Sequence, residues 1–181
     1  MLAMGASQAE PPEGFVLGQS NLTPMVAQTL TPLLSDWIMR SRNMAVAQGV
    51  DTIPAAVRSA LAGYVPETIL ERVRWRLGGG GELTLQEHLF RFGYSPAVTL
   101  DYVVIFQNEA DVADPKLWAH ELRHVMQFAE WGVPEFAARY LQDYEAVEKE
   151  AAEYRWQWMR LAGLIPQGSA GAQTDADSES H

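Results

Sequence analysis

The chain contains no cysteine, so it can form no disulfide and offers no thiolate to a metal ion. Any metal site must therefore use histidine, aspartate or glutamate. Because proteins without disulfides occur in reducing and in oxidising compartments, this absence does not locate the protein in the cell.

Basic residues and long apolar segments are also scarce. Lysine and arginine together number 13 against 23 acidic residues, which gives a formal net charge of −10. A nucleic-acid-binding surface needs clustered Lys and Arg, so no nucleic-acid partner is expected. No run approaches the roughly 20 apolar residues of a transmembrane helix, so no integral membrane segment is expected.

The composition is nevertheless that of a folded protein, because 48% of the residues are hydrophobic. We predict a flexible N-terminal arm over residues 1–20, a single domain over 21–165 and a disordered acidic tail over 166–181. Ser7 and Ala9 have the small-x-small spacing that ends a secretory signal, although the basic region and most of the apolar region before such a site are missing. Two locations stay open: the cytoplasm, with a loose terminus, or an exported or periplasmic location, with residues 1–20 as the remnant of an export signal. The amino-acid sequence does not indicate the oligomeric state.

Proline, glycine and the hydrophobic pattern divide the domain into elements. Strands are expected over residues 73–77, 97–100 and 103–106, with a tight reversal at 101–102. The predicted fold class is α+β, mainly helical with a small antiparallel sheet. Helix starts are expected at Pro24, Pro32, Pro54, Pro66, Thr84, Pro115 and Pro134.

The pattern H-E-x-x-H occupies residues 120–124, in a helix expected from about 115 to 130 and ending before Gly132. Residues four apart lie on one helix face, so His120 and His124 can hold one metal ion between their imidazoles. Glu121 lies on the adjoining edge, where a carboxylate can activate a metal-bound water. The flanking residues are apolar, which predicts a core helix whose two histidines need polar partners.

A catalytic metal site needs a third protein ligand. No third histidine follows the motif at the spacing of the metzincins, and cysteine is absent, so the candidates are the glutamates of the next helix, expected over 134–161. On that helix an apolar stripe faces the core, and Glu148 and Glu150 lie on its two borders, whereas Glu145 and Glu153 point nearer to solvent. We predict Glu148 as the ligand, because small alanines follow it at positions 151 and 152, and keep Glu150 as the alternative.

Two resemblances extend this interpretation. The H-E-x-x-H helix followed by a carboxylate resembles the glutamate zincins (gluzincins), whose third ligand comes from a Glu-x-x-Ala helix, and residues 148–151 have that form. The acid that usually follows this alanine, and that supports the first histidine, is Ala152 here. More closely, residues from about 53 to 154 resemble a zincin-like metallopeptidase domain, the core domain of extracellular contractile injection system effectors, which also occurs as small stand-alone bacterial proteins. The resemblance implies a zincin-like fold and peptidase activity, without indicating a substrate.

The expected function is zinc-dependent hydrolysis of peptide bonds in a peptide or protein substrate. Zn²⁺ held by His120, His124 and Glu148 would lower the pKa of a bound water, and Glu121 would act as general base. Residues 103–106 are expected to form the edge strand along which the peptide lies. Tyr140, Tyr144 and Arg123 remain alternative donors for the oxyanion.

Two rival hypotheses belong to other classes. The first is a catalytically weak or inactive binding module on a zincin-like scaffold, whose metal is structural. The second is a helical interaction protein without a metal. The presence of Glu121 favours the enzyme, because a structural metal needs no base beside it.

Overall fold

The computed structural model describes residues 23–78 and 96–166. The predicted N-terminal arm, the helix expected from Thr84 and nearly all of the predicted tail lie outside these residues. The described elements, in chain order, are α1 (Pro24–Gln48), β1 (Asp51–Thr52), α2 (Ala55–Leu61), α3 (Glu67–Arg72), β2 (Arg74–Leu77), β3 (Ala97–Leu100), β4 (Val103–Phe106), α5 (Glu109–Val112), α6 (Pro115–Gln142) and α7 (Tyr144–Leu161).

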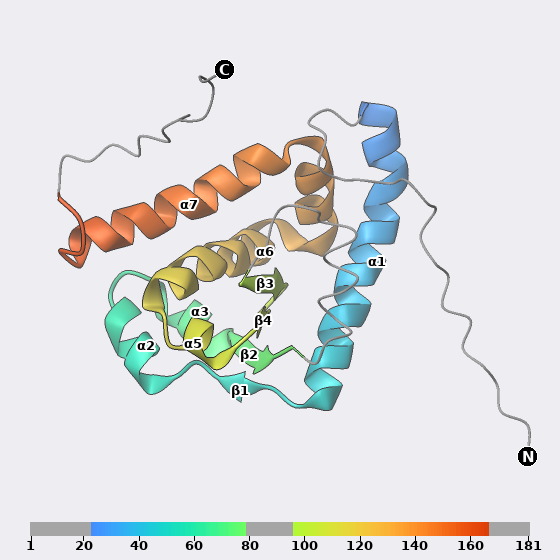
Figure 1. The fold of residues 1–181 in the computed structure, drawn as a ribbon. Helices are drawn as coiled ribbons and strands as arrows, with labels where there is room; N and C mark the ends of the chain where they lie inside the picture. Colours follow the sequence, from blue (N-terminus) through green and yellow to red (C-terminus); the bar gives the residue numbers. More distant parts are fainter. Residues whose placement is uncertain (1–22, 79–95, 167–181) are drawn as a thin grey trace, which may run out of the picture.

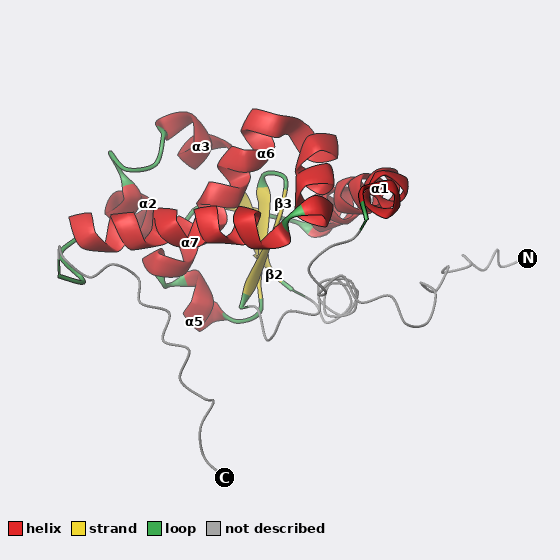
Figure 2. Ribbon diagram, turned by 90° about the horizontal axis from the view of Figure 1, so that it is seen from above, coloured by secondary structure: helices red, strands yellow, loops and turns green. Residues whose placement is uncertain are grey.

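Helix α6 occupies the centre of the described fold (Figure 1). It packs against α7, against α1 and against β3. Seen from above, α1 stands at one end, α2 and α3 stand at the other, and the sheet lies between them (Figure 2). The predicted α+β class, with helices predominating over a small sheet, is confirmed.

Strand β4 lies inside the sheet and separates two parts of the hydrophobic core. Val104 and Phe106 pack in one cluster with the first half of α6, whereas Val103 and Ile105 pack in the other with α1. Alternate residues of a strand point to opposite faces, so all four side chains are buried. The run of four apolar residues therefore marks an internal strand, and the prediction that residues 103–106 form an edge is wrong.

The sheet is mixed, which corrects the prediction of an antiparallel sheet. Its strand order is β1-β2-β4-β3. β1 is antiparallel to β2 and β3 is antiparallel to β4, but β2 runs parallel to β4. The chain between β2 and β3 is long enough to place β3 beyond β4, and the β3–β4 hairpin then sets β4 parallel to β2. β3 is thus an edge strand of the described sheet.

The hairpin turns at Asp101, as predicted, with a left-handed backbone (φ 58°). The Asp101 carboxylate is buried and accepts hydrogen bonds from Arg42 Nη1 of α1 at 2.7 Å and from Arg72 Nη2 at the end of α3 at 3.3 Å. Both guanidinium groups also lie over the Tyr102 ring. This turn therefore fastens two helices to the hairpin.

Helix α1 is continuous from Pro24 to Gln48, so the predicted second start at Pro32 is wrong. An internal proline removes one backbone hydrogen bond and costs about 3 kcal/mol. The buried residues of α1 run along its whole length, from Ala27 through Leu34 to Ala45, and their packing outweighs this cost. The predicted end at Gly49, which has φ 101°, is confirmed.

The chain after the motif breaks twice. Gly132 (φ 75°, ψ 162°) interrupts α6 where a helix end was predicted. The helix expected over 134–161 is instead divided at Asp143, whose side chain accepts a hydrogen bond from the Ala146 N–H and caps α7. Glu148 and Glu150 therefore lie on a separate helix that folds back along α6.

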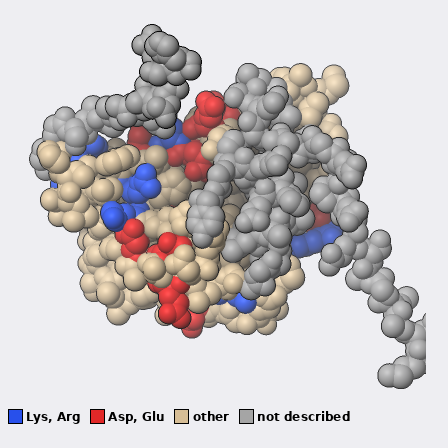
Figure 3. All heavy atoms as spheres, viewed as in Figure 1, with Lys and Arg blue, Asp and Glu red and all other residues tan. Residues whose placement is uncertain are grey.

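None of the described helices is long and apolar enough to cross a membrane. On the face shown in Figure 3, the described acidic and basic side chains form small separate groups and no broad basic area.

Candidate metal centre

Helix α6 carries the H-E-x-x-H residues into the protein interior. Asp114 caps its first turn by accepting a hydrogen bond from the Lys116 N–H, and Pro115 occupies the first helical position. Trp118 and Leu122, on either side of the motif's start, are fully buried. The prediction of a core helix over the motif is confirmed.

Three predicted side chains converge on one point. His120 Nε2 and His124 Nε2 are 3.2 Å apart. Glu148 of α7 places Oε2 3.3 Å from His120 Nε2 and Oε1 3.5 Å from His124 Nε2. One ligand atom from each residue can be chosen so that all lie within 4.8 Å of one another. Between the two glutamates weighed from the sequence, the structure brings Glu148 to the histidines.

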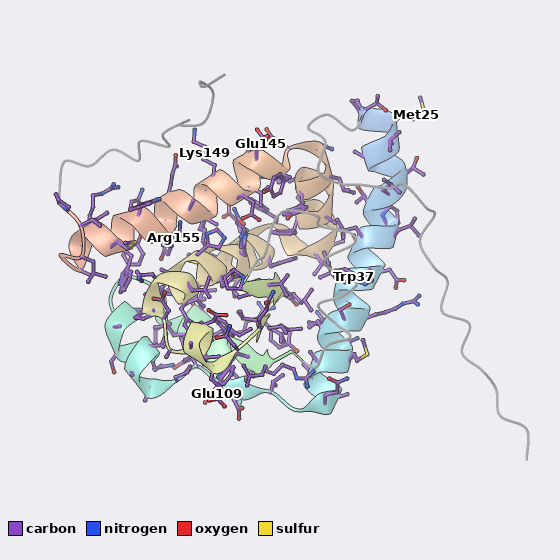
Figure 4. The ribbon with its side chains drawn as sticks, in the orientation of Figure 1. Met25, Trp37, Glu109, Glu145, Lys149 and Arg155 are labelled. Carbon is purple, nitrogen blue, oxygen red and sulfur yellow. The ribbon has the colours of Figure 1, made fainter. Side chains whose placement is uncertain are left out.

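The other glutamates of α7 point elsewhere. Glu145 and Glu153 are exposed, as predicted, and Glu145 lies on the outer face of the helix (Figure 4). Glu150 forms an ion pair with Arg123 and accepts a hydrogen bond from Gln127. It is therefore a neighbour of the cluster and does not point at the histidines.

Glu121 lies between α6 and the sheet. Its side chain is 4% exposed, and its Oε2 accepts a hydrogen bond of 2.7 Å from the hydroxyl of Thr99 on β3. The Thr99 hydroxyl also lies 3.3 Å from the backbone carbonyl oxygen of Glu121. The charge of Glu121 reaches the cluster, because it contributes to the shifted pKa of His124.

In the metal-free protein, the pKa values of His124 and Glu148 are shifted in opposite directions. Burial opposes charge on His124, but the carboxylates of Glu148 and Glu121 and the hydrogen bonds to Glu148 and Gln127 raise the pKa of His124 to about 9. Burial likewise opposes charge on Glu148, yet the two histidines lower the pKa of Glu148 well below its usual range. Without a metal, the buried His124 and the half-buried Glu148 thus form an ion pair.

The two histidines differ at their other ring nitrogen. His124 Nδ1 lies 2.8 Å from Gln127 Oε1. His120 Nδ1 is buried and has no hydrogen-bond partner among the described residues. Ala152, where the gluzincin resemblance expects an acid, offers no side-chain acceptor.

The three predicted oxyanion donors are placed differently. Arg123 forms an ion pair with Glu150. Burial, the charges of Glu148, Tyr144 and Glu121, and a hydrogen bond to Glu148 raise the pKa of Tyr140 well above its usual value, so its hydroxyl stays protonated beside the cluster. Tyr144 packs edge-on against Tyr140, with ring centroids 5.4 Å apart, and is partly exposed.

Sequence reasoning missed two residues of this centre, Thr99 and Gln127. Gln127 carried a readable signal, because it is a polar residue in an apolar run and stands three positions after His124, on the same helix face. Thr99 carried none, since its contact with Glu121 depends on how β3 packs on α6.

Residues 52–132 match the family model of the eCIS core domain. This match supports the eCIS core family for that part of the chain, which contains the H-E-x-x-H motif, Thr99 and Gln127 and ends before Glu148. Neither the curated proteins nor the solved structures include a significant match to the chain.

Proposed function

We propose that the protein is a zinc-dependent peptidase, in which His120, His124 and Glu148 hold the metal and Glu121 is the general base. The observation that carries this proposal is the spacing of the three side chains. Zn²⁺ makes bonds of about 2.0–2.1 Å to histidine, so the ligand atoms of a tetrahedral site lie about 3.3–3.4 Å apart. The 3.2 Å between the two imidazole nitrogens fits that spacing, and the Glu148 carboxylate reaches them through different oxygens, Oε2 at 3.3 Å from His120 Nε2 and Oε1 at 3.5 Å from His124 Nε2. We also propose that the helix, sheet and returning helix have the zincin arrangement.

The chemistry of the donor set agrees with this assignment. Two imidazoles and one carboxylate are the ligand set of many catalytic zinc sites, which keep a further position open. A bound Zn²⁺ would supply a Lewis acid for the scissile carbonyl and a water of lowered pKa. Ligation would replace the ion pair of His124 and Glu148, because a ligand histidine must be neutral.

Glu121 would move the proton. Its Oε2 accepts a hydrogen bond of 2.7 Å from the Thr99 hydroxyl, so Oε1 would be the oxygen that takes a proton from the attacking water. The water oxygen would bond to the carbonyl carbon, the C–N bond would then break, and Glu121 would return the proton to the leaving nitrogen. A glutamine at this position could keep the shape but could not accept the proton.

The substrate would lie along β3. This strand is an edge of the described sheet, and its Thr99 contacts the proposed base. Tyr140 would donate its neutral hydroxyl to the oxyanion that develops on the carbonyl. β3 thus takes the role that the sequence suggested for residues 103–106.

The test combines metal analysis with cleavage of a peptide library, made from a whole-proteome digest and read by mass spectrometry. We expect near-stoichiometric zinc in the wild type, in Glu121→Gln and in the control Glu145→Gln, which changes an exposed acid of α7. New peptide termini should appear with the wild type and the control only. Unchanged cleavage by Glu121→Gln would refute its role as base.

The same measurements address the alternative of a binding module. A protein that binds zinc, loses it in His124→Ala and cleaves no peptide would contradict the peptidase and leave a structural metal. A protein that contains no zinc and gains no stability from it would remove both metal hypotheses.

A further inference from the structure

We propose that Gln127 is the positioning residue of this centre, which fixes His124 in the tautomer whose Nε2 faces Glu148 and His120. The inference rests on the metal-ligand role proposed for His124. Gln127 is completely buried, although a polar amide is costly to bury unless its groups are hydrogen-bonded. The oxygen and the NH₂ group of its side chain both have hydrogen-bond partners.

The surroundings of Gln127 fix the orientation of its amide. Its Nε2 lies 2.7 Å from Glu150 Oε2 and 3.3 Å from the Val147 carbonyl oxygen, and these two atoms can only accept hydrogen bonds from it. The NH₂ group must therefore point at α7, and the amide oxygen must point at His124. A flipped amide would set an oxygen against a carboxylate and a carbonyl.

That orientation determines where His124 carries its proton. The amide oxygen of Gln127, 2.8 Å from Nδ1, can only accept, so Nδ1 must be the protonated nitrogen. In the neutral ring, the lone pair is then on Nε2, the atom that lies 3.2 Å from His120 Nε2 and 3.5 Å from Glu148 Oε1. Gln127 thus presents His124 in the form that a metal ion requires.

Gln127 also connects the motif helix to the helix that supplies Glu148. Its partner Glu150 forms an ion pair with Arg123 of α6. Burial raises the pKa of Glu150, but the hydrogen bonds from Arg123 and Gln127 lower it by more, so the carboxylate stays charged. These side chains form a series of hydrogen bonds, His124–Gln127–Glu150–Arg123. The series begins at a proposed ligand on α6, crosses to α7 two residues after Glu148, and returns to α6. Because Gln127 is neutral, it orients His124 without adding a negative charge beside it.

The test measures metal affinity and ring tautomer, not peptidase activity. Gln127→Met keeps the volume of the side chain but removes both its acceptor and its donors. Loss of such an orienting partner typically lowers metal affinity about 10- to 100-fold. We expect a zinc affinity reduced in that range, measured by competition with a chromophoric chelator, and an altered visible spectrum of the Co²⁺-loaded protein.

A swap variant sharpens the test. Gln127→Glu alone should weaken zinc binding, because its carboxylate would face Glu150. The double variant Gln127→Glu/Glu150→Gln restores a donor opposite position 127 and still offers His124 an acceptor, so zinc affinity should recover toward the wild-type value. Failure of the double variant to bind zinc more tightly than Gln127→Glu would contradict the proposed chain of hydrogen bonds.

The matched control is Tyr64→Phe. The Tyr64 hydroxyl donates to the Tyr154 backbone carbonyl at 2.7 Å, so this variant loosens α7 without touching the cluster. If Gln127 only docks α7, both variants should affect zinc binding alike; we expect Tyr64→Phe to lower stability and to leave the affinity within about twofold of wild type. Equal affinities in wild type and Gln127→Met would overturn the proposal.

Nitrogen-15 NMR of the zinc-loaded wild type gives a readout that needs no variant. We expect His124 to be protonated at Nδ1, and a proton on Nε2 would overturn the assignment. A wild type that binds no zinc would overturn this inference and the proposed function together. Weak zinc binding in Gln127→Met, combined with no cleavage by the wild type, would leave Gln127 supported while the peptidase failed.

Discussion

The hydroxyl of Thr99 donates a hydrogen bond to Glu121 Oε2 over 2.7 Å, and both residues are buried. This contact joins the edge strand β3 to the motif helix α6. It links the surface on which we place the substrate to the residue that we propose as base.

Thr99→Val keeps the shape of the side chain and removes this donor. A buried carboxylate that loses a hydrogen-bond partner costs about 1–3 kcal/mol, so the free energy of unfolding should fall by that amount. Zinc content should stay unchanged, and kcat should fall because the base is no longer oriented. Thr99→Ser retains the hydroxyl and should recover most of the stability and most of kcat. Denaturant titration measures the stability and peptide cleavage measures kcat. A Ser variant as impaired as the Val variant would count against the hydrogen bond.

Glu148→Gln should remove most of the bound zinc, because it replaces the only proposed carboxylate ligand. Glu145→Gln, which alters an exposed acid of the same helix, should retain zinc. Glu150→Gln still offers an acceptor to Gln127 and should lose far less zinc than Glu148→Gln. Metal analysis after dialysis against a weak chelator distinguishes the three. Loss of zinc in Glu150→Gln, with retention in Glu148→Gln, would reverse the assignment.

Zinc should stabilise the folded protein. A ligand present at 100 times its dissociation constant adds about 2.7 kcal/mol to the free energy of unfolding when it binds only the folded state. We therefore expect the thermal midpoint to rise with zinc and to fall with a chelator. His124→Ala should abolish the response, and a full response in that variant would place the metal elsewhere.

The metal-free protein should be most stable between about pH 4.5 and 6.5. The folded-state pKa of His124 is raised from 6.5 to about 9, so its contribution is complete below 6.5 and is lost as the pH rises through 9. The pKa of Glu148 is lowered from 4.5, so its contribution is present above 4.5 and is lost as the pH falls. Denaturant titrations in chelator across this range test the curve, and Glu148→Gln should flatten it.

Zinc affinity should depend on pH through the same histidine. Because His124 is protonated below about pH 9 in the metal-free protein, ligation displaces a proton. The apparent affinity should rise with pH up to about 9 and then level off. Proton release measured by calorimetry in buffers of different ionisation enthalpy provides an independent check.

The Asp101 turn gives a prediction about the scaffold. Asp101→Ala removes the partner of Arg42 and Arg72 and also places alanine in the left-handed region, which costs about 1–2 kcal/mol. Asp101→Asn loses the charge but suits that backbone, so it should be less destabilised than Ala by about this difference. Equal losses in denaturant titration would show that the backbone contributes nothing.

The candidate site residues on α6 and α7 could be predicted from local sequence patterns. His120, His124 and Glu121 follow from a spacing within one helix, and Glu148 follows from its place beside an apolar stripe. These are local properties, since helical periodicity reports which side of a segment is buried. The break at Asp143 did not disturb this inference, because Glu148 and the stripe residues around it remain on one helix.

Contacts between distant segments were not predictable in the same way. Three of the four described strands were located correctly and the two-residue β1 was missed. The order and direction of the strands depend on where the chain returns after β2, which no local pattern encodes. The continuous apolar run of β4 did carry a sign of an internal strand, as sequences buried on both faces do not alternate. Thr99 could not be connected to Glu121 for the same reason that the sheet order could not be derived.

The order of the ligands along the chain has a consequence for biosynthesis. Both histidines, Glu121 and Thr99 precede the break at Asp143, and Glu148 follows it on α7. A nascent chain that has emerged only as far as residue 142 therefore has two of the three proposed ligands. Capture of the metal, and with it any hydrolytic activity, would have to wait until α7 has been synthesised and has docked on α6.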